Sequence, residues 1–156
     1  MIVISLLTWL IVIYSLKIVV VGNPAYDLVR SAPKAILKDA ANYLEGDEII
    51  SDDSSSLFVQ QFLRLTTITF VLFVVEIGIL FYFILKDPQL GIPWIILVKN
   101  VIMVVLGYNA HRQVNGNVFE SILDIPSWAI FCERISYLIT AAGFLFLFMI
   151  FNHLIS

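Results

Sequence analysis

Three residues of the kind that carry chemistry lie inside two successive apolar stretches of the chain. Glu76 is near the middle of the run 62–85, and Lys99 and Asn100 lie inside the run 92–108. A charged side chain at the centre of a bilayer costs ~2.5–3.5 kcal/mol on insertion scales, so such residues usually face the interior of a helical bundle. An ion pair, a proton relay and an ion path all use these residue types.

The short connector KDPQLG between the two runs predicts an antiparallel hairpin of touching helices. At a rise of ~1.5 Å per residue, Glu76 lies roughly 15 Å from the connector and Lys99 roughly 10 Å from it. A long side chain spans that difference. Glu76 and Lys99 can therefore meet each other, or each can meet a partner subunit.

Two interpretations of this polar group stay open. In the first, the group fixes the register of the hairpin or holds a neighbouring subunit. Removing one member of a buried ion pair leaves the other as an unpaired buried charge, which is strongly destabilising. In the second it lines a proton or ion path in which Glu76 titrates, with Thr66 and Thr69 placed at helical spacing on the same face.

The remaining candidate ligands give no recognised metal pattern. His111, Cys132 and Glu133 are acceptable metal ligands, but their spacing matches no known motif. A bis-histidyl haem is disfavoured, because His111 and His153 are predicted at opposite ends of their helices, about 25–30 Å apart. Glu133 and Arg134 mark where the fourth apolar run enters the hydrocarbon. No cofactor is expected, and without a catalytic fingerprint we do not expect an enzyme acting alone.

Composition places the whole chain in a membrane. Of 156 residues, 60% are hydrophobic and 13% are charged, against about 25% charged in soluble domains, and the mean hydropathy is +0.96. The part outside the apolar runs is too small for a separate soluble core, so residues 1–156 are predicted to form a single polytopic domain. The net charge of −3 gives no basic surface, and no nucleic-acid partner is expected.

Four apolar runs are long enough to span a bilayer as helices. Between the first two, a cytoplasmic-side loop over 22–60 contains an amphipathic pattern at about 32–45, which fits a helix in the membrane interface or one packed on a partner or on the protein's own loops. The residues 47–56 are predicted to be a solvated acidic linker. The fold class is therefore an all-α membrane protein, a four-transmembrane-helix bundle with one short amphipathic interfacial helix, whose spans lie at about 2–21, 62–85, 92–108 and 128–154.

Small and polar residues form stripes on two of the predicted spans. Such stripes let helices approach closely within a bilayer. They comprise Ser5, Thr8 and Ser15 in the first span, and Glu133, Ser136, Tyr137, Thr140 and Gly143 in the fourth.

Basic residues near the spans predict the orientation. The loops after the first and third runs, with their flanks, hold six of them, whereas the connector after the second run holds only Lys86. The positive-inside rule then places both termini outside, in a prokaryotic cytoplasmic membrane or an organellar inner membrane.

The sequence favours a small accessory or structural subunit of a larger membrane complex, embedded in the lipid bilayer and bound to other integral membrane subunits, as a hetero- or homo-oligomer. The main alternative is a proton or ion channel or transporter that uses Glu76 and Lys99. Further alternatives are a holin-like pore former and an accessory subunit of a redox or monooxygenase complex.

Overall fold

The computed structural model describes residues 2–45, 53–112 and 118–152, which form seven α-helices and no strand. Their bounds are α1 (Ile2–Val21), α2 (Pro24–Ser31), α3 (Lys34–Glu45), α4 (Asp53–Lys86), α5 (Gly91–Arg112), α6 (Val118–Leu123) and α7 (Ser127–Phe151).

Four stretches are long and apolar enough to cross a membrane, judged by length and composition. They are α1 with its continuation through α2, then α4, α5 as far as Asn109, and α7. A helix of 20 residues is about 30 Å long, which matches the hydrocarbon thickness of a bilayer. The expected all-helical architecture with four long apolar helices is confirmed.

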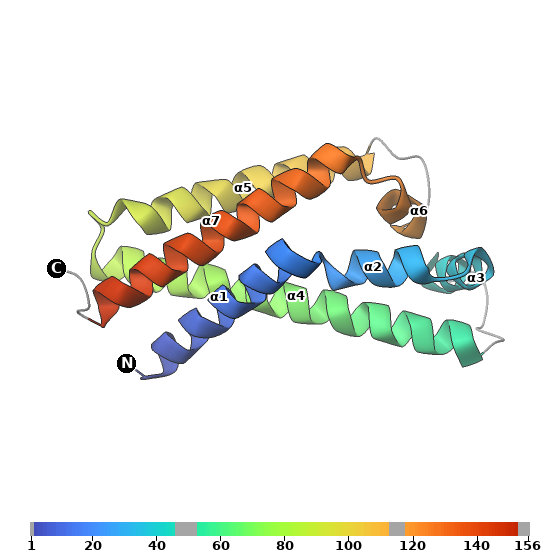
Figure 1. The fold of residues 1–156 in the computed structure, drawn as a ribbon, viewed down its shortest axis with the longest axis horizontal. Coiled ribbons are helices and arrows are strands. Elements are labelled where there is room, and N and C mark those ends of the chain that lie inside the picture. The colour runs from blue at the N-terminus through green and yellow to red at the C-terminus, as the bar shows by residue number, and fades with distance from the viewer. Residues whose placement is uncertain (1, 46–52, 113–117, 153–156) are drawn as a thin grey trace.

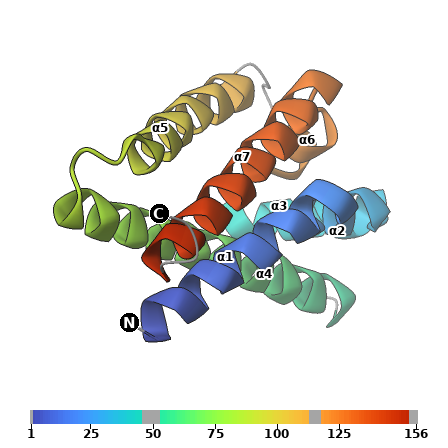
Figure 2. The same ribbon diagram turned by 60° about the vertical axis from the view of Figure 1, so that its left-hand side comes forward.

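The long helices run side by side as a bundle with two distinct ends (Figure 1). The start of α1, the end of α7 and the α4–α5 connector lie at one end, which we call the terminal end; α2, α3 and α6 lie at the other, the loop end. α7 packs most extensively on α1 and also contacts α5. α4 and α5 meet at their connector and separate toward the loop end (Figures 1 and 2).

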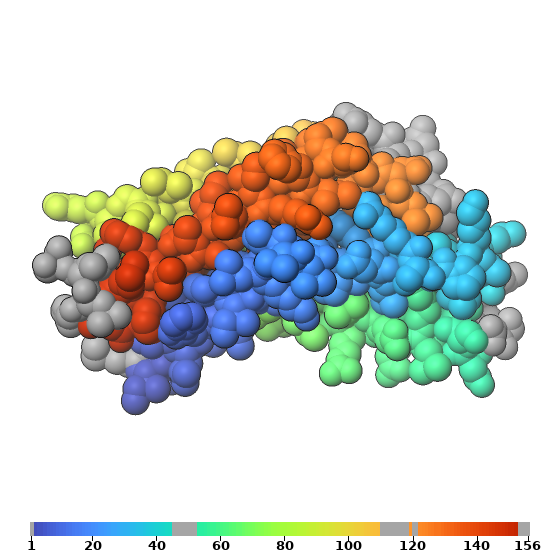
Figure 3. All heavy atoms as spheres, viewed as in Figure 1, coloured from blue at the N-terminus to red at the C-terminus, as the bar shows by residue number. Residues whose placement is uncertain are grey.

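The close approach of α1 and α7 uses the predicted small and polar stripes. Thr8 and Ser15 of α1 are each only 1% exposed, and Ser136 and Thr140 of α7 are also buried. The Thr8 hydroxyl is satisfied within its own helix, donating 2.7 Å to the carbonyl oxygen of Ile4. Small side chains with locally satisfied hydroxyls let the two helices pack without leaving buried polar atoms unpaired. The space-filling view shows α1 and α7 in direct contact along one face (Figure 3).

An apolar core fills the terminal end of the bundle, between the level of Glu76 and the connector. All four long helices contribute to it, and at its edge the Lys86 ammonium lies 4.6 Å from the centre of the Phe151 ring. We call this the terminal-end core; its buried residues are Ile11, Val12, Ile79, Leu80, Phe83, Ile96, Phe144, Leu147 and Phe151.

A second apolar core fills the loop end. α6, which lies in a segment expected to be polar loop, contributes Phe119, and the ring of Phe119 packs edge-on against those of Phe58 and Phe62 at 5.4 and 5.1 Å. We call this the loop-end core; its buried residues are Ala25, Val29, Leu37, Ala40, Ala41, Phe58, Val59, Phe62 and Phe119.

The described part of the segment 22–60 contains more helix than the one expected at about 32–45, because it holds α2, α3 and the start of α4. Gly22, with φ of +105°, ends α1 in a left-handed conformation that favours glycine. Asn23 then caps α2, its side chain accepting from the Ala25 amide at 3.1 Å, and Pro24 suits the first helical position. α2 runs to Ser31, directly before the segment with the amphipathic pattern.

The amphipathic segment packs on the protein itself. The apolar face of α3, with Leu37, Ala40 and Ala41, is buried in the loop-end core against α4. These three side chains therefore face the protein's own interior, whereas Leu44 of the same helix is 39% exposed. The predicted linker is wrong from Asp53 onward, because α4 already begins there; residues 47–52 lie outside the described part.

Candidate functional site

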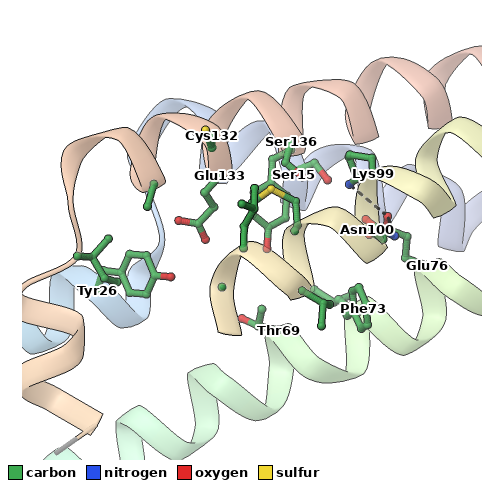
Figure 4. A pocket seen from close by; sticks show the side chains of 18 of the residues that line it. Ser15, Tyr26, Thr69, Phe73, Glu76, Lys99, Asn100, Cys132, Glu133 and Ser136 are labelled. Carbon is green, nitrogen blue, oxygen red and sulfur yellow. Dashed lines mark hydrogen bonds and ion pairs between the residues drawn. The ribbon is translucent and has the colours of Figure 1, made fainter. Parts of the chain in front are cut away.

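A cavity of about 430 Å³, partly open to the outside, lies between the helices of the bundle where α4 and α5 have separated. α1, α2, α6 and α7 also contribute to its wall. The wall is mostly apolar, including Leu72, Phe73 and Met103, but polar side chains face it at two levels (Figure 4). A pocket of this size and character is typical of sites for small molecules.

The deeper polar level is built by residues from α4, α5 and α7. The Nζ of Lys99 lies 3.8 Å from Oε1 of Glu76. Asn100 donates from Nδ2 to the same oxygen at 2.8 Å, and Lys99 donates to the hydroxyl of Thr140. The structure thus brings Glu76, Lys99 and Asn100 together and ties them to the fourth long helix.

The charges at this deeper level offset each other. The side chains of Lys99 and Glu76 are only 13% and 9% exposed, so each would be costly to bury alone. Asn100 adds a donor to the carboxylate, and Thr140 adds an acceptor to the ammonium. The group is therefore an internally neutral network of hydrogen bonds and one ion pair that joins α4, α5 and α7.

The second polar level lies toward the loop end and centres on Glu133 of α7. Its Oε1 accepts a hydrogen bond of 2.9 Å from Nδ2 of Asn23, at the junction of α1 and α2. Figure 4 shows the Glu133 carboxylate on the same side of the cavity as the Tyr26 ring. Among the described residues, no lysine or arginine forms an ion pair with Glu133.

A hydroxyl pair connects α1 and α4 between the two levels. The hydroxyl oxygens of Tyr14 and Thr69 are 2.7 Å apart. Thr69 also donates to the carbonyl oxygen of Leu65 at 3.0 Å. Because a threonine hydroxyl has one proton, Tyr14 is the donor of the pair. The Tyr14 ring further packs edge-on against Tyr137 of α7, with ring centres 6.4 Å apart.

The other predicted site residues are separated by the structure. Thr66 is exposed and donates to the carbonyl oxygen of Phe62 within its own helix, whereas Thr69 lines the cavity. Arg134 is exposed outside the cavity, although Glu133 lines it. His111 lies on the last turn of α5, but its side chain falls outside the described part.

The metal alternatives use the two histidines of the chain, His111 and His153. The side chain of His111 and the whole of His153 lie outside the described part of the chain. Cys132 is a free, half-buried thiol. Within the described ranges, no three His, Cys, Asp or Glu residues form a group able to hold a metal ion.

Sequence reasoning missed Asn23, Tyr14 and Tyr26 as residues of the site. The Asn23-Pro24 pair is a helix-start signal and could have located the α2 cap. Asn23 and Glu133 are 110 residues apart in the chain, and Tyr14 and Thr69 are 55 residues apart. No local sequence pattern predicts contacts between segments so far apart.

The two apolar cores lie on either side of the cavity along the bundle. In the described part of the chain, the arrangement is a partly open cavity between two packed apolar ends. It can hold a small, mostly apolar molecule and offer polar contacts at two levels. The chain matches no protein-family model, no curated protein and no solved structure.

Proposed function

We propose that the chain is a multi-pass integral membrane protein whose four long apolar segments each cross the bilayer. Support comes from their length and composition and from the large apolar side chains on the outer face of the bundle. Ile95, Val101 and Val105 of α5 are all more than half exposed, which is costly in water and favourable in lipid.

We place the loop end in the cytoplasm and both termini outside. The loop end carries Arg30, Lys34, Lys38 and Arg64, whereas the terminal end carries Lys86. The positive-inside rule supports this orientation, in a prokaryotic cytoplasmic membrane or an organellar inner membrane.

Cysteine labelling tests the orientation. Two variants are made in a Cys132→Ser background. Lys38→Cys places one exposed thiol at the loop end, and Gln89→Cys places one exposed thiol at the terminal end. A membrane-impermeant maleimide added to intact cells is expected to label only the variant at position 89. Labelling of the variant at position 38 alone would contradict the proposed orientation, and labelling of both would contradict the membrane-spanning arrangement.

The function that the geometry supports best is the binding of a small, mostly apolar molecule inside the bundle, without catalysis. The observation that carries this proposal is the cavity of about 430 Å³, walled by apolar side chains and supplied with polar groups at two levels. The sequence offers no catalytic fingerprint beside it. The protein would then hold or carry its ligand within the membrane.

This proposal is favoured over an open channel or a holin-like pore. The terminal-end core and the loop-end core flank the cavity with packed apolar residues. A continuous ion path needs polar groups or water along its length. Glu76 and Lys99 also offset each other's charge, which favours a fixed network over a site that must take up and release an ion.

Binding can be tested with a cavity-filling variant and a matched control. Gly107 lines the cavity and Gly78 does not; a Cβ at either position meets no atom within 4 Å. The purified protein, titrated with the neutral molecule neopentylbenzene, is expected to bind it with one site per chain by ligand-observed NMR. Gly107→Leu should abolish this binding and Gly78→Leu should retain it. An unchanged affinity in Gly107→Leu, or no binding to the unmodified protein, would refute the proposal.

A second candidate is an accessory role in a larger membrane assembly, including a redox or monooxygenase complex. The exposure of α5 favours it: 17% of its apolar window is buried within the chain, against 28% to 33% for the other three. A second membrane subunit packed on α5 would bury this face. Extraction in mild detergent should then recover α5-dependent partners, and recovery of a monomer of 17.7 kDa alone would argue against it.

A further inference from the structure

The charged groups that line the cavity do not balance. Glu76 and Lys99 form an ion pair at the deeper level, so they contribute no net charge. Glu133 also lines the cavity, and its described polar contact is the neutral amide of Asn23. The described lining therefore carries one carboxylate without a cationic partner.

The neighbouring arginine, Arg134, lies near Gly22 on the outside of the bundle, as does Asp27. A Cβ built on Gly22 would be 3.6 Å from a guanidinium nitrogen of Arg134 and 3.7 Å from Oδ2 of Asp27. Both side chains are exposed and neither lines the cavity. Arg134 interacts electrostatically with Glu133, but it does so from outside the cavity, so Glu133 is the group of the two that a molecule in the cavity can contact.

Aromatic side chains form part of the wall of the cavity that Glu133 lines. Tyr14, Tyr26, Trp128 and Tyr137 all line it, from three different helices. Figure 4 shows the Tyr26 ring on the same side of the cavity as the Glu133 carboxylate. The face of an aromatic ring attracts a cation within about 6 Å, more strongly when water is excluded. A carboxylate among aromatic rings is a favourable environment for an organic ammonium group.

We propose that the cavity binds a singly charged organic cation, with its ammonium group at Glu133 and its apolar body toward Phe73 and Met103. This inference rests on the proposed binding function and adds the class of ligand. The apolar wall fits an organic body better than an inorganic ion, since Ca²⁺ takes six to eight oxygen ligands. The internally neutral Glu76–Lys99 end offers no counter-charge to a second charged group.

Two probes of the same shape and different charge test the proposal. Benzyltrimethylammonium carries one positive charge, and neopentylbenzene is its neutral carbon analogue. Affinities for the purified full-length protein are measured by ligand-observed NMR, with Gly107→Leu as the blank for uptake by the detergent micelle. The unmodified protein is expected to bind the cation at least tenfold more tightly than the neutral analogue.

Matched variants locate the source of this preference. Glu133→Gln should reduce it to less than threefold, whereas Asp27→Asn, which removes one carboxylate outside the cavity, should leave it unchanged. Tyr26→Leu should weaken binding of the cation more than binding of the neutral probe. Circular dichroism would reveal whether Glu133→Gln fails to fold. In that case Tyr26→Leu still tests the proposal.

The possible outcomes distinguish failure of the cation preference from failure of the proposed binding function. Equal affinity for the two probes, both lost in Gly107→Leu, would refute the cation preference and leave the binding cavity standing. A preference that survives Glu133→Gln, or one that is lost equally in Asp27→Asn, would also refute it. Failure of both probes to bind would overturn the cation site and the binding function together.

Discussion

The side-chain amide of Asn23 donates a hydrogen bond of 2.9 Å to Oε1 of Glu133, a residue 110 positions further along the chain. The other end of the same amide, Oδ1, accepts from the Ala25 amide and caps α2. One side chain thus starts a helix and anchors α7 to it. The position of Glu133 in the cavity depends on where α1 ends and α2 begins.

Replacing Asn23 by aspartate should destabilise the protein while preserving the helix cap. Asp is as good an N-cap as Asn, but Asn23→Asp removes the donor and sets a second carboxylate beside Glu133. We expect a loss of about 1.5–3 kcal/mol, the range for a hydrogen bond to a charged group. Unfolding by sodium dodecyl sulfate in mixed micelles, followed by helical circular dichroism, measures it.

A second-site variant distinguishes loss of the Asn23–Glu133 contact from damage to the N-cap of α2. Adding Glu133→Gln to Asn23→Asp removes the like-charge contact and lets the glutamine amide donate to the new carboxylate. Stability should recover toward that of the unmodified protein. If Asn23→Asp alone unfolds at the same detergent concentration as the unmodified protein, the contact contributes nothing.

Removing the ammonium of Lys99 should leave Glu76 as an unpaired buried charge. Breaking one side of a buried ion pair typically costs roughly 3–5 kcal/mol, and we expect Lys99→Met to lose stability on that scale. The double variant Glu76→Gln, Lys99→Met should recover most of it. Arg64→Met removes an exposed cation of α4 and should change stability by less than about 0.5 kcal/mol. Equal losses in the single and double variants would show that the pair does not act as a unit.

Gly143 is predicted to be irreplaceable where α5 crosses α7. A Cβ at this position would lie 2.6 Å from Cδ1 and 3.2 Å from Cγ1 of Ile96, which is 1% exposed and has little room to move. Overpacking of this kind costs about 1–3 kcal/mol, so Gly143→Ala should lower the detergent concentration of half-unfolding.

Two further variants control for helix propensity. Gly78→Ala places a methyl group where no atom lies within 4 Å, and it should stabilise α4 by up to about 1 kcal/mol. Adding Ile96→Val to Gly143→Ala deletes the nearest clashing carbon and should restore part of the loss. The steric explanation fails if the two alanine variants change stability in the same direction.

The hydrogen bond from Tyr14 to Thr69 should stabilise the packing of α1 on α4 by a modest amount. Interhelical hydrogen bonds in membrane proteins contribute about 0.6 kcal/mol on average and up to about 1.7 kcal/mol. Tyr14→Phe should lose stability in that range, whereas Tyr108→Phe, at a side chain 66% exposed, should lose none. Thr69→Val completes a double-mutant cycle, and strictly additive effects would mean that the two hydroxyls do not interact.

The sequence located the deeper polar level because its contacts are nearly local. Glu76 and Lys99 lie in two apolar runs that are joined by a six-residue connector. Because the connector is so short, the two helices must lie antiparallel and in contact. The same reasoning misplaced Thr66. At 100° per residue, Thr69 is within about 20° of Glu76 around the helix but Thr66 is about 80° away, and the structure accordingly leaves Thr66 exposed.

Apolar patterning failed where helix formation depends on packing. The first turn of α4, Asp53 to Ser56, is polar and resembles a linker, yet Ser55 is fully buried there and the helix continues into Phe58 and Phe62 of the loop-end core. α3 showed an apolar face in its sequence, but which surface would cover that face was undetermined. Packing against α4 decided it.

The sequence by itself determined the four long apolar helices and the hairpin that pairs a carboxylate with an ammonium, since length, hydropathy and a short turn act locally along the chain. Only the tertiary structure decided that Asn23 reaches Glu133, that Tyr14 reaches Thr69, and that a cavity remains between two packed cores. The reason is physical. Which faces of two distant helices pack together depends on the shapes and hydrogen bonds of all their side chains at once. The hydropathy pattern along one helix does not contain that information.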